Sequence, residues 1–224
     1  MDWNNNAEVL KQVKTDGLLL QHASDRLKDD WSIVETAVGQ NGFALQYASD
    51  NLRDHSYIVG RAVHQNCYAF QYASEKVRSD EYLVHGVLKK DNSLFAHVSE
   101  TLRDNLLFMR KYVLHNYHNA AYLSERLKND KELAYMTIIT CKKGLCLQYF
   151  GPAVKEDESI VLKAIQLTPL AYNYASPILR NNPSFIAKVL PYAKVEALDP
   201  LLNLAMFLKK PEQGRPWVLD LKPL

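Results

Sequence analysis

Two columns of side chains recur along this sequence and could do chemistry, one of cations and one of aromatic rings. Both follow a phrase that returns every 25 residues, which we number from its small residue as position 0: Ser24, Ser49, Ser74, Ser99 and Ser124, then, after a slip of two residues, Gly151 and Ser176. Position +4 is always basic: Lys28, Arg53, Arg78, Arg103, Lys128, Lys155 and Arg180. Position −2 is always aromatic: His22, Tyr47, Tyr72, His97, Tyr122, Tyr149 and Tyr174.

The cation column has two interpretations. A ladder of cations along one edge of the protein would face phosphates or acidic side chains. Locally, a cation in the last turn of a helix favours the helix dipole and pairs with an acid three residues earlier. Such acids stand at position +1 in five copies, so the local interpretation is favoured: Asp25, Asp50, Glu75, Glu100 and Glu125. They give way to Pro152 and Pro177, which leaves Lys155 and Arg180 freer, so the C-terminal third is where an anionic contact would lie if the column makes one.

The aromatic column also has two interpretations. An aromatic ring with a polar tip at a fixed height suits a half-buried row between copies. The same row could contact an extended partner. Packing between copies is the favoured interpretation.

Neither the serine column nor the cysteines predict catalysis or metal binding. A serine nucleophile needs a base, and no matching column supplies one. A small residue lets adjacent helices approach, its hydroxyl can bond the carbonyl one turn back, and Gly151 in the same column supports a constraint on size. Cys141 and Cys146 lack zinc-knuckle spacing, and Cys146 occupies a column of Leu and Ala. With no nucleotide-binding, hydrolase, metalloprotease or calcium-binding motif, we expect no enzyme, cofactor or metal.

The elements that must position these columns are short helices. Position −8 is a column of N-cap residues with one exception, Lys143: Asp16, Asn41, Asn66, Asp91, Asn116, Lys143 and Thr168. Position +6 is a second cap column in which only His55 departs: Asp30, His55, Asp80, Asn105, Asp130, Asp157 and Asn182. Apolar residues at −4, −1 and +3 share one helical face. Each copy is therefore predicted to form two helices of about ten residues, which are too short to be stable without neighbouring copies.

The repeated phrase resembles a known family. In the form N-G-x-A-L-Q-Y-A-S-x-x-L-R-x-D-x-x-x-V-x-x-A-V it is similar to the tandem repeats of domain of unknown function 4116. Residues 42–63 match it nearly throughout, residues 17–38 and 68–87 closely, and the later copies loosely, so the resemblance covers roughly residues 16–190. It implies an all-helical repeat protein of protists, giant viruses or amoeba-associated bacteria. It implies no reaction and offers no catalytic residues to carry over.

The predicted fold class is all-α, a right- or left-handed α-solenoid of about seven 25-residue two-helix repeats with capping helices. Residues 1–210 form a single array, with an N-terminal capping helix at 4–15, repeats at 16–190 and a C-terminal capping helix at 193–210. Residues 211–224 are predicted to be an extended tail. Its Trp217 either folds back on the array or inserts into a partner.

Composition bounds the partners and the compartment. The 224 residues hold 27 Lys and Arg against 25 Asp and Glu, a balance that gives no overall attraction to nucleic acid or anionic membranes. Three cysteines leave at least one unpaired, which favours a reducing compartment. No secretory signal or apolar run of about 20 residues is present. We expect a cytoplasmic protein, or one in a host cytosol if it is a secreted effector.

The sequence therefore favours a non-enzymatic helical-repeat protein that presents an extended surface to a protein partner, as an adaptor or an assembly subunit. One alternative is a nucleic-acid-binding repeat that uses the cation and aromatic columns. Another is the targeting module of a pathogen effector. The predicted partner surface takes in Arg53, Arg78, Arg103, Lys128, Lys155, Arg180, Tyr47, Tyr72, Tyr122, Tyr149, Tyr174 and Trp217.

Overall fold

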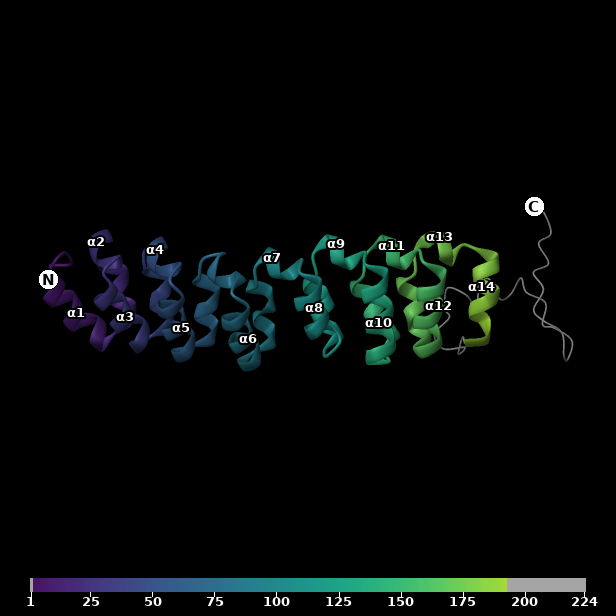
Figure 1. Cartoon of the computed structure of the whole chain (residues 1–224), viewed down its shortest axis with the longest axis horizontal. Helices are drawn as coiled ribbons and strands as arrows, with labels where there is room; N and C mark the ends of the chain where they lie inside the picture. Colours follow the sequence, from purple (N-terminus) through teal and green to yellow (C-terminus); the bar gives the residue numbers. More distant parts are fainter. Residues whose placement is uncertain (1, 193–224) are drawn as a thin grey trace, which may run out of the picture. The chain divides into compact units, whose positions relative to one another are not determined.

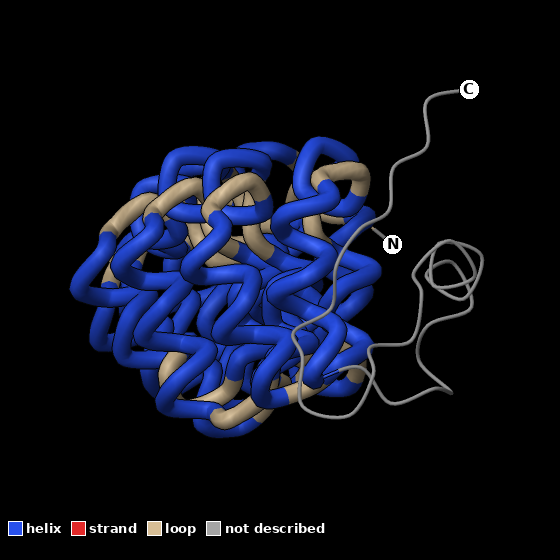
Figure 2. Tube along the Cα trace, turned by 90° about the vertical axis from the view of Figure 1, so that its right-hand side faces the viewer, coloured by secondary structure: helices blue, strands red, loops and turns tan. Residues whose placement is uncertain are grey.

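The computed structural model describes residues 2–192, and over that range the chain forms helices and no strand (Figures 1 and 2). The chain divides into two compact units, Met1–Arg103 and Asp104–Leu224. The predicted all-α class is therefore confirmed for the described residues. The predicted helix at 193–210 and the tail with Trp217 lie outside them.

Unit 1 repeats one order of elements, a 3-10 helix (η), a short helix and a long α-helix, after an initial long helix; the short helix is an α-helix except in the third copy, where it is 3-10. In chain order its elements are α1 (Asn6–Thr15), η1 (Gly17–His22), α2 (Asp25–Lys28), α3 (Trp31–Gln40), η2 (Gly42–Tyr47), α4 (Asp50–Arg53), α5 (Ser56–Gln65), η3 (Cys67–Tyr72), η4 (Val77–Ser79), α6 (Glu81–Lys90), η5 (Asn92–His97) and α7 (Glu100–Arg103). The long helices α1, α3, α5 and α6 pack successively, each on the next (Figure 1). The helix expected at 4–15 is thus α1, with Asn5 as its cap.

Unit 2 shows the same order of elements. They are α8 (Leu106–Val113), η6 (Tyr117–Tyr122), α9 (Glu125–Lys128), α10 (Lys131–Cys141), η7 (Gly144–Tyr149), α11 (Pro152–Lys155), α12 (Glu158–Leu167), η8 (Pro169–Tyr174), α13 (Pro177–Arg180), α14 (Pro183–Val189) and η9 (Leu190–Tyr192). The two extra residues of the slip are taken up at the end of α10. That helix runs on to Cys141, and Lys142 then turns the chain with a left-handed φ of 52°.

The prediction of one continuous first helix in each copy is wrong. In the second copy, η2 ends at Tyr47, and Ala48 and Ser49 are extended before α4 begins. The Ser49 side-chain oxygen accepts the amide hydrogen of Leu52 (3.2 Å) and caps the new helix. A copy therefore has three helical elements, of which the second has only three or four residues.

The cap columns explain where these elements begin. At position −8, five side chains accept an amide hydrogen two residues later, as the sequence predicts: Asp16, Asn41, Asn66, Asp91 and Asn116. At position +6 every residue caps a long helix. His55, expected as an exception, does so through Nδ1, which accepts from the Tyr57 amide (3.3 Å).

Main-chain hydrogen bonds join residues of successive copies inside each unit. The amide of position 0 donates to the carbonyl of position +4 in the preceding copy. In unit 1 these bonds are Ser49 to Lys28 (2.9 Å), Ser74 to Arg53 (3.0 Å) and Ser99 to Arg78 (3.2 Å). In unit 2 they are Gly151 to Lys128 (2.8 Å) and Ser176 to Lys155 (2.9 Å).

The core of each unit lies between the 3-10 helices and the long helices. The apolar columns predicted from the sequence fill it, for example with Leu20, Leu45 and Phe70 at position −4, all fully buried. In three copies the approach is very close, because a Cβ added to Gly17, Gly42 or Gly144 would lie 2.3, 2.5 or 2.0 Å from the carbonyl oxygen of Ala37, Ala62 or Ala164. Glycine at −7 and alanine at +13 are therefore a packing pair.

Candidate partner-binding surfaces

The serine column joins neighbouring copies by hydrogen bonds. Ser74 Oγ donates to Asp54 Oδ1 of the preceding copy (2.5 Å) and accepts the Val77 amide (3.2 Å). Ser49 and Ser124 make the same two contacts, with Asp29 and Asp104 as acceptors. The expectation that these hydroxyls bond the carbonyl one turn back is wrong, because position 0 begins a helix and has no helical turn behind it. These hydroxyls serve packing and capping.

The cation column of unit 1 is half-buried and paired. Arg53, Arg78 and Arg103 each form an ion pair with the acid three residues earlier, as the local interpretation predicts. Their side chains are only 35%, 26% and 30% exposed. Arg78 also donates to the His97 carbonyl of the next copy (3.0 Å). These guanidinium groups are therefore engaged within the chain.

The cation column of unit 2 is half-buried too. Lys128 pairs with Glu125 (2.6 Å), and Lys155 Nζ donates to the Gln148 carbonyl (3.0 Å). Burial first, and then the charge of Lys128, lower the pKa of Lys155. The Nε atom of Arg180 is buried without a hydrogen-bond partner among the described residues. The Nε atoms of Arg53, Arg78 and Arg103 in unit 1 are buried in the same way.

The aromatic column is half-buried in every copy where the sequence places a tyrosine: Tyr47, Tyr72, Tyr122, Tyr149 and Tyr174. Tyr72 meets Phe43 of the preceding copy edge-on, with ring centroids 6.2 Å apart. Tyr149 Oη lies 2.9 Å from His118 Nδ1 of the preceding copy. Burial and neighbouring tyrosines raise the pKa of Tyr149. These contacts lie between copies, where the packing interpretation places them.

A different aromatic row is exposed on the long helices of unit 1, and we call it the aromatic face. It consists of Trp31, Tyr57 and Tyr82, which stand in the first turns of α3, α5 and α6 and are 40%, 51% and 91% exposed. Trp31 and Tyr57 stack with centroids 5.6 Å apart and planes at 16°. The Tyr57 hydroxyl donates to Glu35 (2.7 Å). Tyr57 and Tyr82 occupy the same position, +8, on α5 and α6, which pack on one another.

Bare helix backbone adjoins two of these rings. Gly60 and Gly86 stand one turn after Tyr57 and Tyr82, and a Cβ added to either would meet no atom within 4 Å. Glycine inside a helix costs about 1 kcal/mol relative to alanine. Packing within the chain gives no reason for that cost at Gly60 or Gly86. At Gly39, by contrast, the Arg61 guanidinium covers the place of the missing Cβ (2.8 Å).

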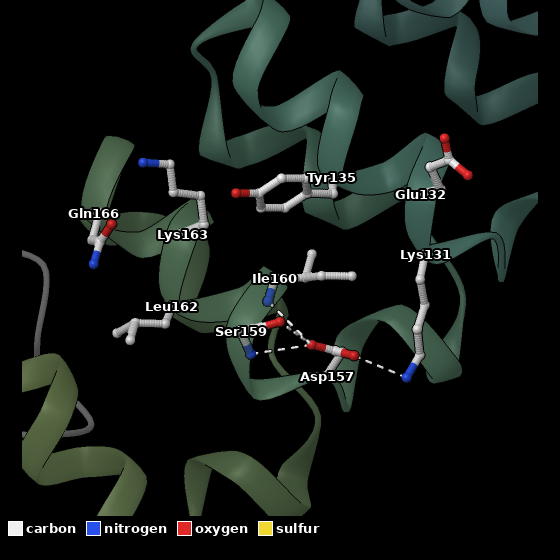
Figure 3. A pocket seen from close by; sticks show the side chains of 9 residues that line it. All are labelled: Lys131, Glu132, Tyr135, Asp157, Ser159, Ile160, Leu162, Lys163 and Gln166. Atoms are coloured by element: carbon white, nitrogen blue, oxygen red, sulfur yellow. Dashed lines mark hydrogen bonds and ion pairs between the residues drawn. The ribbon is translucent and has the colours of Figure 1, made fainter.

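A groove of about 540 Å³ lies between α10 and α12 in unit 2 (Figure 3). The side chains of α10 that line it are Lys131, Glu132 and Tyr135. The cap of α12 and its exposed side supply Asp157, Ser159, Ile160, Leu162, Lys163 and Gln166. The groove is open to solvent.

The two ends of this groove differ electrostatically. At one end Lys131 Nζ pairs with Asp157 Oδ2 (2.9 Å), while Asp157 Oδ1 accepts from the amides of Ser159 and Ile160. The bond from Lys131 and the next from Ser159 lower the pKa of Asp157 to about 2, so this carboxylate is ionised and saturated. At the other end the Tyr135 hydroxyl points toward the Lys163 side chain (Figure 3).

Cys146 lies in the core, as its place in the column of Leu and Ala predicts. Cys146 is fully buried, and burial raises the pKa of its thiol to about 12. Over residues 2–192 no three His, Cys, Asp or Glu side chains converge as a metal site. In the same range, no helix combines the length and apolar character that a membrane span requires.

The columns of cations and rings did not lead from the sequence to either exposed feature. The aromatic face could have been found from Tyr57 and Tyr82, which both stand at position +8 on the polar side of an amphipathic helix. The groove offered no comparable sign, because Tyr135 and Lys163 belong to different copies and to different positions within them.

Comparison with known proteins gives one family. No curated protein and no solved structure matches the chain. Two segments, residues 9–53 and 135–180, match the model of a family described as a domain of unknown function, DUF4116. These segments contain two of the three glycine–alanine packing pairs complete, Gly17 with Ala37 and Gly144 with Ala164. The resemblance seen in the repeated phrase is thus confirmed, and in these two segments the chain is similar to the DUF4116 family.

Proposed function

We propose that this chain is a non-enzymatic α-solenoid of about seven 25-residue copies that presents an extended surface to a protein partner. It would act as an adaptor or as a subunit of a larger assembly. The recurring order of elements in each unit and the main-chain bonds between copies 25 residues apart support the architecture. Stacked copies of this kind offer long surfaces rather than deep pockets.

The aromatic face is the observation that carries the proposal. Tryptophan and tyrosine are enriched at protein interfaces and dominate their binding energy. Tyr82 is 91% exposed, and Trp31 and Tyr57 form an exposed stack on the two preceding long helices. The bare backbone at Gly60 and Gly86 would let a partner chain approach the helices closely.

The nucleic-acid alternative has less support. Its cations would have to be those at position +4, yet Arg53, Arg78 and Arg103 are engaged by acids of their own copies. The role of a targeting module in an effector stays a prediction from the sequence.

Affinity capture with the full chain tests the proposal. The double variant Tyr57→Ala/Tyr82→Ala should lose the proteins that co-purify with the wild-type chain from a native lysate. Ile178→Ala is the matched control, because it removes a side chain of unit 2 that is 69% exposed. Identical captured proteins in all three samples would contradict the proposal. Salt-sensitive retention on nucleic acid, reduced by Arg78→Ala, would favour the alternative.

A further inference from the structure

Two hydrogen-bond donors at one end of the α10–α12 groove have no bonded partner among the described residues. They are the Lys163 ammonium and the Tyr135 hydroxyl, which lie on facing helices with the hydroxyl turned toward Lys163 (Figure 3). The ammonium offers three donors and no acceptor, and the phenol offers one donor. An oxygen anion placed between them would accept from both.

The acids of the groove do not fill that role. Asp157 is committed at the opposite end to Lys131, Ser159 and the Ile160 amide. Glu132 is exposed, and its carboxylate points away from Tyr135 and Lys163 (Figure 3). The donor pair therefore lacks an anion from the residues that line the groove.

The floor beside the donor pair is apolar. Ile160 is 4% exposed and lies beneath the Tyr135 ring (Figure 3), which is itself 42% exposed. Leu162, next to Lys163 in α12, also lines the groove. A ligand that places a charge at Lys163 would thus lay apolar groups on Ile160 and the tyrosine ring.

The wider charge of unit 2 favours the same ligand. Its described residues, 104–192, hold 11 Lys and Arg against 7 Asp and Glu, a net charge of +4 with His neutral. The described residues of unit 1, 2–103, hold 11 against 14, a net charge of −3. A positive field of this kind steers acidic partners and not basic ones.

We propose that the α10–α12 groove binds a peptide segment of the partner in which an acidic residue stands next to apolar ones. Its carboxylate accepts hydrogen bonds from Lys163 Nζ and Tyr135 Oη, and its apolar neighbours lie on Ile160. This inference rests on the proposed function, since it names the chemistry of a protein partner. It uses a surface separate from the aromatic face.

Fluorescence anisotropy with the full chain tests the groove. The probe is a fluorescein-labelled peptide of alternating Glu and Leu, with Gln–Leu and Lys–Leu peptides of equal length as comparisons. The Glu–Leu peptide should bind more tightly than either. Lys163→Met should weaken its binding about tenfold, Tyr135→Phe about threefold, and Lys163→Arg should preserve most of it.

The matched control is Lys142→Gly. It also removes one positive charge from unit 2, and glycine fits the left-handed φ of 52° at that position. Binding should be unchanged in this variant. If Lys142→Gly weakens binding as much as Lys163→Met, the attraction is unspecific and the inference fails.

The remaining outcomes also decide the matter. Equal binding of the Gln–Leu peptide would overturn the inference. A single-stranded oligonucleotide that displaces the probe, and that no longer binds the Lys163→Met variant, would also overturn it, because the groove would then bind nucleic acid. If no peptide binds while Tyr57→Ala/Tyr82→Ala still abolishes capture, the groove proposal fails and the proposed function stands. Failure of both experiments would remove both.

Discussion

The copies are of two kinds, which differ in how the 3-10 helix packs on the long helix. We call a copy close when glycine at −7 faces alanine at +13, as Gly42 faces Ala62. The Gly42 amide then donates to Gln65 Oε1 at the end of the same copy (2.6 Å). In the next copy, Cys67 and Val87 occupy the equivalent positions, and Lys90 replaces the glutamine.

This replacement turns a bond within a copy into a bond between copies. The Lys90 ammonium donates to the Val63 carbonyl at the end of α5, in the preceding copy (3.0 Å). Close copies also bond their neighbours, as Gln40 Nε2 does in donating to the Thr15 carbonyl (3.2 Å). They differ in that the amide of the glycine at −7 bonds a side chain at the end of its own copy, whereas the Cys67 copy has Lys90 there and depends on its neighbour for that contact. The first two predictions below test this difference, and the next two test the charged contacts between copies.

The largest effect is expected at the close pair. Gly42→Ala would place a Cβ 2.5 Å from the Ala62 carbonyl oxygen, so the backbone must move. Overpacking of this kind costs about 1–3 kcal/mol of unfolding free energy. Cys67→Ala, at the equivalent open position, should change it by less than about 1 kcal/mol. Urea denaturation followed by circular dichroism compares the two, and equal losses would refute the distinction.

A smaller effect is expected at the serine column, whose hydroxyls join neighbouring copies. Ser74→Ala removes the cap of Val77 and the bond to Asp54 in the copy that depends on its neighbour, and should cost about 1–2 kcal/mol. Ser49→Ala, in a close copy, should cost about half as much. The same denaturation experiment measures both, and a larger loss at Ser49 would reverse the comparison.

A third effect concerns acid. The bond from Lys76, followed by that from Ser74, lowers the pKa of Asp54 below its ordinary value of 3.8. A carboxyl group with a lowered pKa stabilises the fold above its unfolded pKa, and this contribution is lost as the pH falls through the folded pKa. The unfolding free energy should therefore fall less between pH 5 and pH 3 in Asp54→Asn than in the wild type. If the unfolding free energies of the variant and the wild type fall in parallel with pH, the lowered pKa of Asp54 is not the cause.

The smallest effect is expected at His97, whose main-chain carbonyl accepts a hydrogen bond from the Arg78 guanidinium. Burial, and then the charge of Arg78, lower the pKa of His97 below 6.5. Protonation of the folded state is therefore disfavoured, and stability falls as the pH drops below the unfolded pKa of about 6.5. Nuclear magnetic resonance titration should give a midpoint below 6.5 that rises in Arg78→Gln. An unchanged midpoint in that variant would exclude the charge as a cause.

The sequence predicts the elements well where one residue decides the local structure. The caps at Asn41 and Asp80 are examples, because a single side-chain oxygen fixes each helix start. It fails at Ser49, where helical spacing continues through a break that only the cap geometry reveals. It also misses the pairing of Gly42 with Ala62, since 20 residues separate two small residues whose contact depends on a main-chain oxygen.

The candidate surfaces were less predictable for a related reason. Column patterns identify residues that recur, and recurring residues such as Arg78 are those that join one copy to the next. The proposed surfaces use positions that recur in only some copies, such as Tyr82 at +8 and Lys163 at +12. The exposure of Tyr82 and the direction of Lys163 follow only from the packed helices.

The hydrogen bond between the amide of position 0 and the preceding copy has a consequence for how such chains evolve. It uses only main-chain atoms, and Gly151 makes it as well as Ser49 does. Duplication or deletion of a whole 25-residue stretch of the gene therefore preserves every such bond, whichever side chains the new copy brings. Chain length can then drift freely, while a gain or loss of a few residues must be absorbed in a turn such as that at Lys142.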